Sequence, residues 1–344
     1  MDLRIAVDDL TAYVAEIFAR VGCSPEEARR VAASLVDSNL AGHDSHGVIR
    51  TPRYVDWVES GDLTPNQTIE VVVDAPAFAV VDGRYGFGHS VTPPAIEIGI
   101  EKAKAGGLAA VALRNSGHLG RVGQWAEQAA RAGLISIHFV NVSGSSLVAP
   151  YGARERRFST APFCVGVPRP GADPVILDFA TSLVAEGKAA VAFQGGKALP
   201  ANALVGPEGE PSGDPALFYS GLAALRAFGG HKGSGLALIC ELIGGSLTGT
   251  GATRPERRFA NGMFSIYVDP ARINPEKLFD EDVSGFLDWV REAKPIPGEK
   301  VLTPGEPERL ARADRLAHGV PLGEGTWASI VEAARKLGIE RAPI

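Results

Sequence analysis

The first sixty residues show an apolar pattern of helical period. Apolar residues recur every three or four positions over residues 7–21 and again over 25–40, which predicts two amphipathic helices. Ser24 and Pro25 suit the N-cap and the first position of the second helix. A third helix is expected over 49–60. The chain therefore opens with helices.

The middle of the chain alternates short β-type runs with helical runs. Seven strands are predicted, over residues 71–74, 77–82, 108–113, 134–140, 163–167, 175–178 and 263–268. Helices are expected over residues 93–105, 120–132 and 233–248. Residues 194–216 are rich in Gly, Pro and Ala and predict an exposed loop.

The last part of the chain returns to helices. They are predicted over 275–293, 307–318 and 326–337, with a proline-containing linker between the first two. The order is helical, then mixed, then helical.

Composition narrows the classes of protein that remain. The chain has 344 residues, of which 45% are apolar, and a formal net charge of −6. This balance excludes global disorder and argues against a nucleic-acid or membrane surface as the main partner. Three isolated cysteines, Cys23, Cys164 and Cys240, indicate no disulfide framework. An N-terminus with Asp2, Asp8 and Asp9 and no apolar core is not typical of a signal peptide, so a cytoplasmic location is expected.

The usual nucleotide fingerprints are missing. Gly86 and Gly88 begin a dinucleotide-type glycine pattern, but Val91 stands at its third position. The run Gly195–Lys197 is followed by Ala198 instead of the hydroxyl residue of a P-loop. If the chain binds a nucleotide, it does so in another way.

Four polar clusters could carry chemistry. Residues 42–50 hold two imidazoles, a carboxylate, a hydroxyl and a guanidinium in one turn between helices. A histidine there could transfer a proton and an arginine could bind a carboxylate; alternatively, Asp44 or Ser45 caps the next helix. Residues 114–120 follow a strand, where α/β proteins often place ligand groups, or form a simple strand–helix turn.

The other two clusters contain glycines or an acid. Residues 229–235 join Lys232 and four glycines to a helix start, which favours an anion site over a flexible loop. Asp178 ends a strand, and helix capping is the simpler interpretation of it. His43 and His46 lack a third ligand at a telling spacing, so no metal site is predicted, and His89 and His138 are expected to be surface or structural residues.

Six motifs together resemble the type 2 malate/L-lactate dehydrogenase family. In chain order they are Asp44–Val48 with Arg50, Asn115–Gly120, Ala149–Gly152, Leu177–Ser182, His231–Leu236 and Pro304–Glu306. The stretch Phe228–Gly249 is most similar to the branch of broad-range 2-hydroxycarboxylate dehydrogenases.

The resemblance implies an α+β fold and a homodimer. It implies a non-Rossmann NAD(P)-binding domain with a largely antiparallel sheet, over residues 67–283. A helical domain would be formed by both chain ends, over 1–66 and 284–344. The activity would be NAD(P)-dependent oxidation of a small 2-hydroxy acid, or reduction of its 2-oxo acid.

The resemblance also implies roles for individual residues. The catalytic residues would be His46 as proton donor and acceptor, with Ser45, His118 and Asp178; Arg50, Asn115 and Thr160 would bind the substrate. The cofactor-binding residues would be Asp178, Phe179, Ala180, Thr181, Ser182, Leu183, Val184, His231, Lys232, Gly233, Gly305, Glu306 and Pro307. NAD and NADP stay open, because Arg154, Arg156 and Arg157 could attract a 2′-phosphate or simply be solvated.

One departure from the family pattern concerns substrate choice. Ser159-Thr160-Ala161-Pro162 replaces the common Gly-Thr-Asn-Pro, so an amide is missing at Ala161. Reduction of a cyclic imino acid by the same histidine is an alternative reaction, because the family that the chain resembles contains such reductases. A non-catalytic metabolite-binding protein is the alternative of another class.

Overall fold

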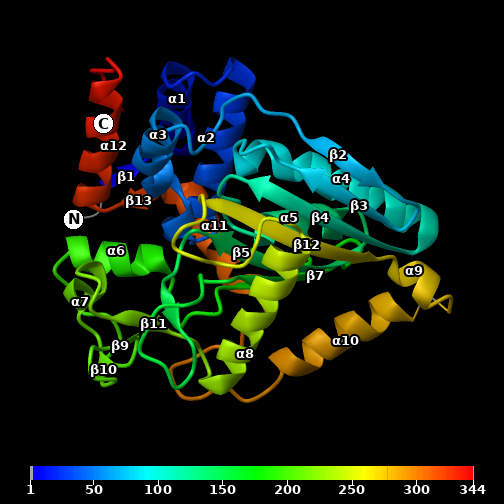
Figure 1. The fold of residues 1–344 in the computed structure, drawn as a ribbon. Helices are drawn as coiled ribbons and strands as arrows, with labels where there is room; N and C mark the ends of the chain where they lie inside the picture. Colours follow the sequence, from blue (N-terminus) through cyan, green and yellow to red (C-terminus); the bar gives the residue numbers. More distant parts are fainter. Residues whose placement is uncertain (1–2, 277, 344) are drawn as a thin grey trace.

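A seven-stranded sheet lies at the centre of the computed structural model, which describes residues 3–276 and 278–343 (Figure 1). Its strand order is β2-β3-β4-β12-β5-β7-β8, and only the pair β3–β4 is parallel. The strands are β2 (Glu70–Asp74), β3 (Phe78–Asp82), β4 (Leu108–Ser116), β5 (Ile135–Ser143), β7 (Phe163–Val167), β8 (Val175–Phe179) and β12 (Ala260–Val268). All seven predicted strands are confirmed, as is the mixed α and β composition. Asp2 and residue 277 of the predicted helix 275–293 lie outside the described residues.

Two helices pack side by side against this sheet. They are α4 (Gly88–Gly106) and α5 (Gly123–Arg131), and their apolar faces share a core with the strands. The structure corrects both predicted starts. α4 begins five residues earlier than predicted because residues 88–92 are buried. α5 begins later because Gly120, at φ +69°, cannot continue a helix.

The two chain ends share a second core. It joins α1 (Val7–Arg20), α2 (Pro25–Leu40) and α3 (Thr51–Glu59) to α12 (Glu324–Lys336). A short antiparallel pair, β1 (Leu3–Ile5) with β13 (Val320–Leu322), fastens the ends together. The predicted helices are present, and Ser24 caps α2 by accepting a hydrogen bond from the Glu27 backbone N–H at 3.2 Å. Three-residue strands are too short to be read from periodicity, so this pairing was not predicted.

A small lobe, at the lower left of Figure 1, is built from residues 184–228 together with residues 148–149. It contains α6 (Glu186–Gln194), α7 (Pro215–Tyr219) and a four-stranded sheet of β10 (Pro211–Ser212), β9 (Leu204–Val205), β11 (Ala224–Arg226) and β6 (Val148–Ala149). The prediction of an exposed loop over 194–216 is wrong, because Ala203 and Leu204 are fully buried. The lobe's core collects residues from 148 to 225, so no local period announces it.

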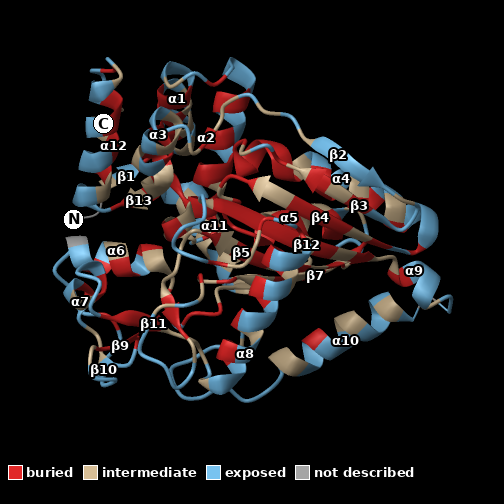
Figure 2. Ribbon diagram, viewed as in Figure 1, coloured by how far each residue is buried: buried red, intermediate tan, exposed pale blue. Residues whose placement is uncertain are grey.

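The predicted helix 233–248 is α-helical only in its first part. It is observed as α8 (His231–Cys240), followed by a π-helical segment, η3, over Glu241–Leu247. The remaining helices are α9 (Pro270–Ile273), α10 (Phe279–Arg291) and α11 (Glu306–His318). Figure 2 shows that α10 is largely exposed. In the described part of the chain, no helix combines the length and apolarity needed to cross a membrane.

Candidate active site

The turn between α2 and α3 places His46. It consists of two short 3-10 helices, η1 (Asp44–His46) and η2 (Val48–Arg50), joined by Gly47. A Cβ on Gly47 would come within 3 Å of the Asn39 side chain, whose Oδ1 accepts a hydrogen bond from the Val48 backbone at 2.8 Å. The turn therefore packs directly on α2.

Helix α11 holds the same turn from its other side. Arg315 pairs with the Asp44 carboxylate at 2.5 Å, and Glu308 Oε1 lies 3.1 Å from His43 Nε2. The predicted site turn is thus fixed by residues some 270 positions away in the sequence. Asp44 serves this pairing, and neither Asp44 nor Ser45 caps α3, whose N-cap residue is Arg50.

His46 and His118 lie together. Their rings are stacked, with centroids 5.6 Å apart and an interplanar angle of 13°. Ser45 Oγ lies 3.0 Å from His46 Nδ1. Burial, helped by the nearby Arg50 charge, lowers the pKa of both histidines well below its usual range. Both imidazoles are therefore neutral near pH 7.

A buried chain of hydrogen bonds extends behind His118. Tyr54 Oη lies 2.6 Å from His118 Nδ1 and 3.2 Å from His89 Nε2. His89 Nδ1 lies 3.0 Å from Ser34 Oγ, which donates to Gln124 Oε1 at 2.7 Å. The sequence did not indicate this chain, because its members come from four different helices and share no spacing.

Arg50 contacts both the turn and the small lobe. Its Nε donates to the Ser45 carbonyl at 2.7 Å, and its Nη2 pairs with Glu186 Oε2 at 3.1 Å. A Cβ on Gly187 would come within 3 Å of Ser45, so α6 approaches the turn closely. Glu186 was not predicted as a site residue. Its carboxylate accepts a hydrogen bond from the Arg50 guanidinium, which was predicted to bind the substrate.

Two further predicted substrate residues, Asn115 and Thr160, make hydrogen bonds with other parts of the chain. The Asn115 amide donates to Asp82 Oδ2 at 2.9 Å, from a backbone at φ +51°. The Thr160 carbonyl accepts hydrogen bonds from the Thr181 backbone and hydroxyl at 2.9 and 3.0 Å. Within the described residues, no hydrogen bond joins either side chain to His46.

The departure at Ala161 has a local substitute. Ala161 is fully buried at φ +37°, and its N–H donates to Ser159 Oγ at 3.1 Å. Ser159 Oγ donates in turn to Glu241 Oε1 at 2.7 Å, in the π-helical segment. Thr253 also donates to this buried carboxylate. Ser159 and Glu241 therefore provide the polar groups of this region.

The predicted cofactor segment 178–184 runs beside residues 226–228. The Leu183 N–H donates to the Arg226 carbonyl at 2.7 Å, and the Phe228 N–H donates to the Thr181 carbonyl at 3.0 Å. At its start, Asp178 Oδ2 accepts the Gly123 N–H at 2.7 Å. Burial raises the pKa of Asp178, against the opposing effects of His43, this hydrogen bond and Arg121.

The N-terminus of α8 follows directly. His231 and Lys232 are exposed there, after Gly229 and Gly230 with positive φ. A Cβ on Gly233 would come within 3 Å of the Phe228 carbonyl oxygen, so only glycine fits this close approach. The start of α8 and the segment 178–184 therefore lie at one place.

The third predicted cofactor segment meets β8 at its other end. Gly305, at φ +95°, precedes α11, with Pro307 in the first turn, and the Ile176 N–H donates to the Pro304 carbonyl at 3.3 Å. Glu306 pairs with Arg291 at 2.9 Å, and its hydrogen bond from the Thr303 backbone lowers its pKa.

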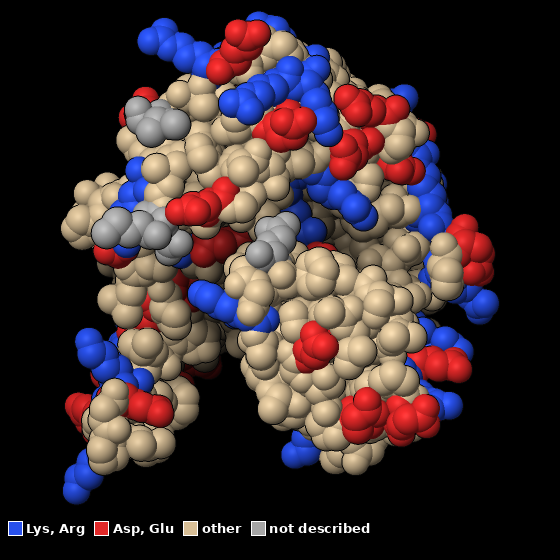
Figure 3. Space-filling model, turned by 90° about the vertical axis from the view of Figure 1, so that its left-hand side faces the viewer, with Lys and Arg blue, Asp and Glu red and all other residues tan. Residues whose placement is uncertain are grey.

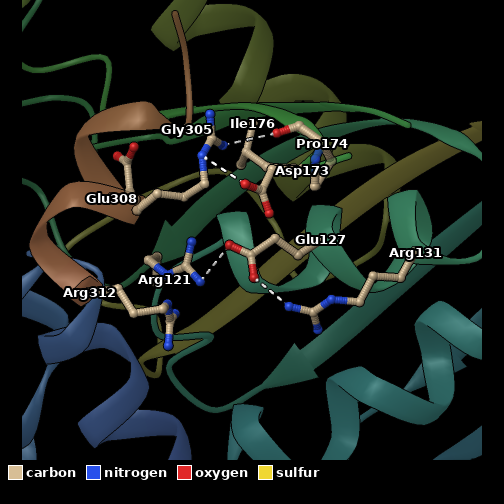
Figure 4. Close-up of a pocket in the computed structure, with 10 residues that line it drawn as sticks. Arg121, Glu127, Arg131, Asp173, Pro174, Ile176, Gly305, Glu308 and Arg312 are labelled. Carbon is tan, nitrogen blue, oxygen red and sulfur yellow. Dashed lines mark hydrogen bonds and ion pairs between the residues drawn. The ribbon is translucent and has the colours of Figure 1, made fainter. Parts of the chain in front are cut away.

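A charged pocket of about 190 Å³ opens beside Gly305 (Figure 4). Arg121 forms its buried wall and pairs with Glu127 at 2.8 Å and with Asp37 at 3.3 Å. Arg309 pairs with Asp173 at 3.3 Å. These pairs balance one another, so the pocket is polar without a bare charge.

The face that carries the chain ends is uneven in charge. In Figure 3, Lys, Arg, Asp and Glu side chains gather over the upper part, and the bulge below it is largely uncharged.

The three arginines considered for a 2′-phosphate contact the protein itself: Arg154 and Arg157 pair with Glu208 and Glu155, and Arg156 lies over the Phe218 ring. No group of three or more potential metal ligands occurs in the part of the chain that is described.

Comparisons with a family model, known sequences and solved structures match nearly the whole chain to the same family. A family model described as malate/L-lactate dehydrogenase matches residues 5–331. Hydroxycarboxylate dehydrogenase B of Escherichia coli O157:H7 is 40% identical, over 98% of this chain and 95% of its own. A solved structure of a candidate malate/lactate dehydrogenase from E. coli superposes with a TM-score of 0.94 at 39% identity, covering 98% of this chain and 96% of that one. A Δ1-pyrroline-2-carboxylate/Δ1-piperideine-2-carboxylate reductase of Pseudomonas syringae pv. tomato is 31% identical over 96% of both chains.

Proposed function

Because the chain belongs to the malate/L-lactate dehydrogenase family, we propose that it is an NAD(P)-dependent oxidoreductase acting on a small 2-hydroxy acid and its 2-oxo acid. The observation that carries the proposal is the stacked pair His46 and His118 beside the Arg50 guanidinium. An imidazole that can exchange a proton next to a carboxylate-binding group is what this reaction needs.

We propose that three segments along β8 hold a dinucleotide. Segment 178–184 and the α8 N-terminus with Lys232 lie by the end of β8, residues 305–307 lie by its beginning, and Gly233 leaves room where a side chain would clash. Backbone N–H groups at a helix start and a lysine favour phosphate. When bound, the nicotinamide supplies or accepts the hydride.

The chain's own residues would handle the substrate and the proton. Arg50 would bind the substrate carboxylate. His46 would take up a proton from solvent before reduction and pass it to the oxygen at C2, and as the neutral imidazole it would accept that proton during oxidation. Ser45 would orient His46 through its contact with Nδ1.

The variant His46→Ala tests this role. Turnover should fall by about a hundredfold or more, because a positioned acid–base group contributes that much. NAD(P)H affinity, measured by fluorescence titration, should stay close to that of the unmodified protein. Full turnover in the variant would remove His46 from the mechanism.

Reduction of a cyclic imino acid is the second candidate. The similarity to a pyrroline/piperideine carboxylate reductase favours it, and Arg50 and His46 could serve a C=N substrate in the same way. NAD(P)H oxidation measured against a 2-oxo acid and a cyclic imine of matched size separates the two. The substrate with the higher kcat/KM identifies the reaction.

We also propose that the protein is a homodimer. Within each chain, we propose a helical domain of residues 1–66 and 284–344 beside a central domain of residues 67–283. The shared core of the chain ends supports the helical domain. Large exposed apolar side chains on α8, η3 and α10 support a subunit contact: Leu238, Ile239, Leu242, Phe286 and Trp289. Light scattering after size exclusion should give twice the 36.0 kDa chain mass; a single-chain mass at micromolar concentration would rule the dimer out.

A further inference from the structure

The hydrogen-bond chain behind His118 has a definite direction. A serine hydroxyl carries one proton, and Ser34 gives it to Gln124 Oε1. Its oxygen must then accept from His89, so the His89 proton is on Nδ1. His89 is fully buried, and burial lowers its pKa to about 4, so it carries only that proton near pH 7.

The direction continues to the site. The unprotonated Nε2 of His89 accepts the Tyr54 hydroxyl proton, and the Tyr54 oxygen accepts from His118 Nδ1 at 2.6 Å. We propose that Gln124, Ser34, His89 and Tyr54 form a positioning chain that holds His118 as the neutral tautomer protonated on Nδ1. His118 Nε2, which has no hydrogen-bond partner among the described residues, is then an acceptor.

The chain positions a ring and does not conduct protons. Its far end is the Gln124 amide, which neither releases nor takes up a proton near neutral pH. A proton passed from His118 along the chain would have to end on this amide, and one passed toward His118 would leave an alkoxide at Ser34. The four residues therefore fix the tautomer and orientation of His118, as a second residue commonly does for a reactive imidazole.

This assignment divides the work of the two stacked histidines, and it rests on the proposed function. His118 Nε2 can accept a hydrogen bond from a substrate group but has no proton to donate. Proton donation to the substrate oxygen or nitrogen then falls to His46. The resemblance seen in the sequence implied the role of proton donor and acceptor for His46 and a catalytic role of unspecified kind for His118.

The side chains of this chain come from α2, α3, α4 and α5, so it also links the two cores. Tyr54 belongs to the core of the chain ends, whereas α4 and α5 pack on the central sheet. The state of His118 therefore depends on how these two parts are packed together.

The test is nitrogen NMR of the protein labelled with ¹⁵N-histidine, without substrate or cofactor. Long-range ¹H–¹⁵N correlations show which ring nitrogen carries the proton, and His118→Gln assigns the signal among the seven histidines. We expect His118 protonated on Nδ1. A proton on Nε2 would overturn the proposal.

Tyr54→Phe tests the chain itself, and Tyr13→Phe is its matched control. Both tyrosines are buried in the same core, and the Tyr13 hydroxyl has no hydrogen-bond partner. Tyr54→Phe should shift His118 toward the Nε2-protonated tautomer and lower kcat on the order of tenfold to a hundredfold with little change in KM. Tyr13→Phe should change neither.

Ser34→Ala probes the same chain from its other end. It removes the hydroxyl that accepts a hydrogen bond from His89 and should also shift His118 toward the Nε2-protonated tautomer. If Tyr54→Phe and Ser34→Ala both leave His118 protonated on Nδ1, the proposal is wrong. The NMR result does not depend on turnover, so it stays separate from the failure of the proposed function, which His46→Ala and the substrate assays would reveal.

Discussion

Arg50 shows how the use of a residue depends on its neighbours. Glu186 lies 3.1 Å from its guanidinium and is itself only partly buried. A substrate carboxylate would compete with this glutamate for the same donors. The lobe that carries Glu186 would then influence substrate affinity.

Glu186→Gln should therefore lower the KM for a 2-oxo acid. A partly exposed ion pair is worth about 1 kcal/mol, which corresponds to roughly fivefold. kcat should remain within about twofold, because His46 and His118 are untouched. Glu208→Gln, in the same lobe but paired with Arg154, is the control and should leave KM unchanged. A raised KM in Glu186→Gln would mean that Glu186 positions Arg50 for the substrate.

At the scale of elements, the start of α8 depends on one glycine. The Phe228 carbonyl lies where a side chain at position 233 would have to be. Gly235, two residues further along the same helix, has nothing within 4 Å of such a side chain. Alanine variants at Gly233 and Gly235 therefore separate the effect of close packing from that of helix propensity.

Gly233→Ala should lower the melting temperature and weaken NAD(P)H binding by at least about tenfold, because the helix start must move away from residues 226–228. Gly235→Ala should keep binding and gain up to about 1 kcal/mol of stability, because alanine favours a helix. Thermal melts and fluorescence titrations of both variants measure these effects. Equal behaviour of the two would contradict the close approach at Gly233.

At the scale of the whole molecule, buried neutral histidines make stability depend on pH. His89 and His138 are fully buried, and burial lowers their pKa values to about 4 and about 3. The unfolded chain binds protons at these residues near pH 6.5, whereas the folded chain does not. Stability is therefore complete above that pH and is lost as the pH falls.

The free energy of unfolding should fall by at least about 4 kcal/mol between pH 8 and pH 5, from about 2 kcal/mol for each of these histidines, with a further loss from the buried His46 and His118. Urea unfolding at the two pH values measures it. In His138→Gln, the difference between the two pH values should shrink by about 2 kcal/mol. A stability that is flat over this range would show that both histidines take up protons in the folded state.

Much of the fold could be predicted because its signals are local. The seven strands of the central sheet and the helices at both ends repeat apolar residues at a fixed period, and each period reflects one buried face. Ser24 before α2 is a similar local signal, since its hydroxyl caps a helix three residues on. The motif turns around His46, His118, Asp178 and Lys232 were found for the same reason: each is a short run of unusual residues.

The tertiary structure decided which distant residues these elements and motif turns contact. Leu204 looked like part of a loop because its core partners lie far away in the sequence. The predicted helix becomes π-helical at Glu241, whose carboxylate accepts a hydrogen bond from Ser159. Tyr54, His89, Ser34 and Gln124 form one hydrogen-bond chain only when four helices pack together. The sequence by itself determined most of the helices and strands and pointed to the motif turns, because both depend on neighbours along the chain. Their partners, their protonation and their access to substrate depend on burial and distance, which only the packed molecule provides.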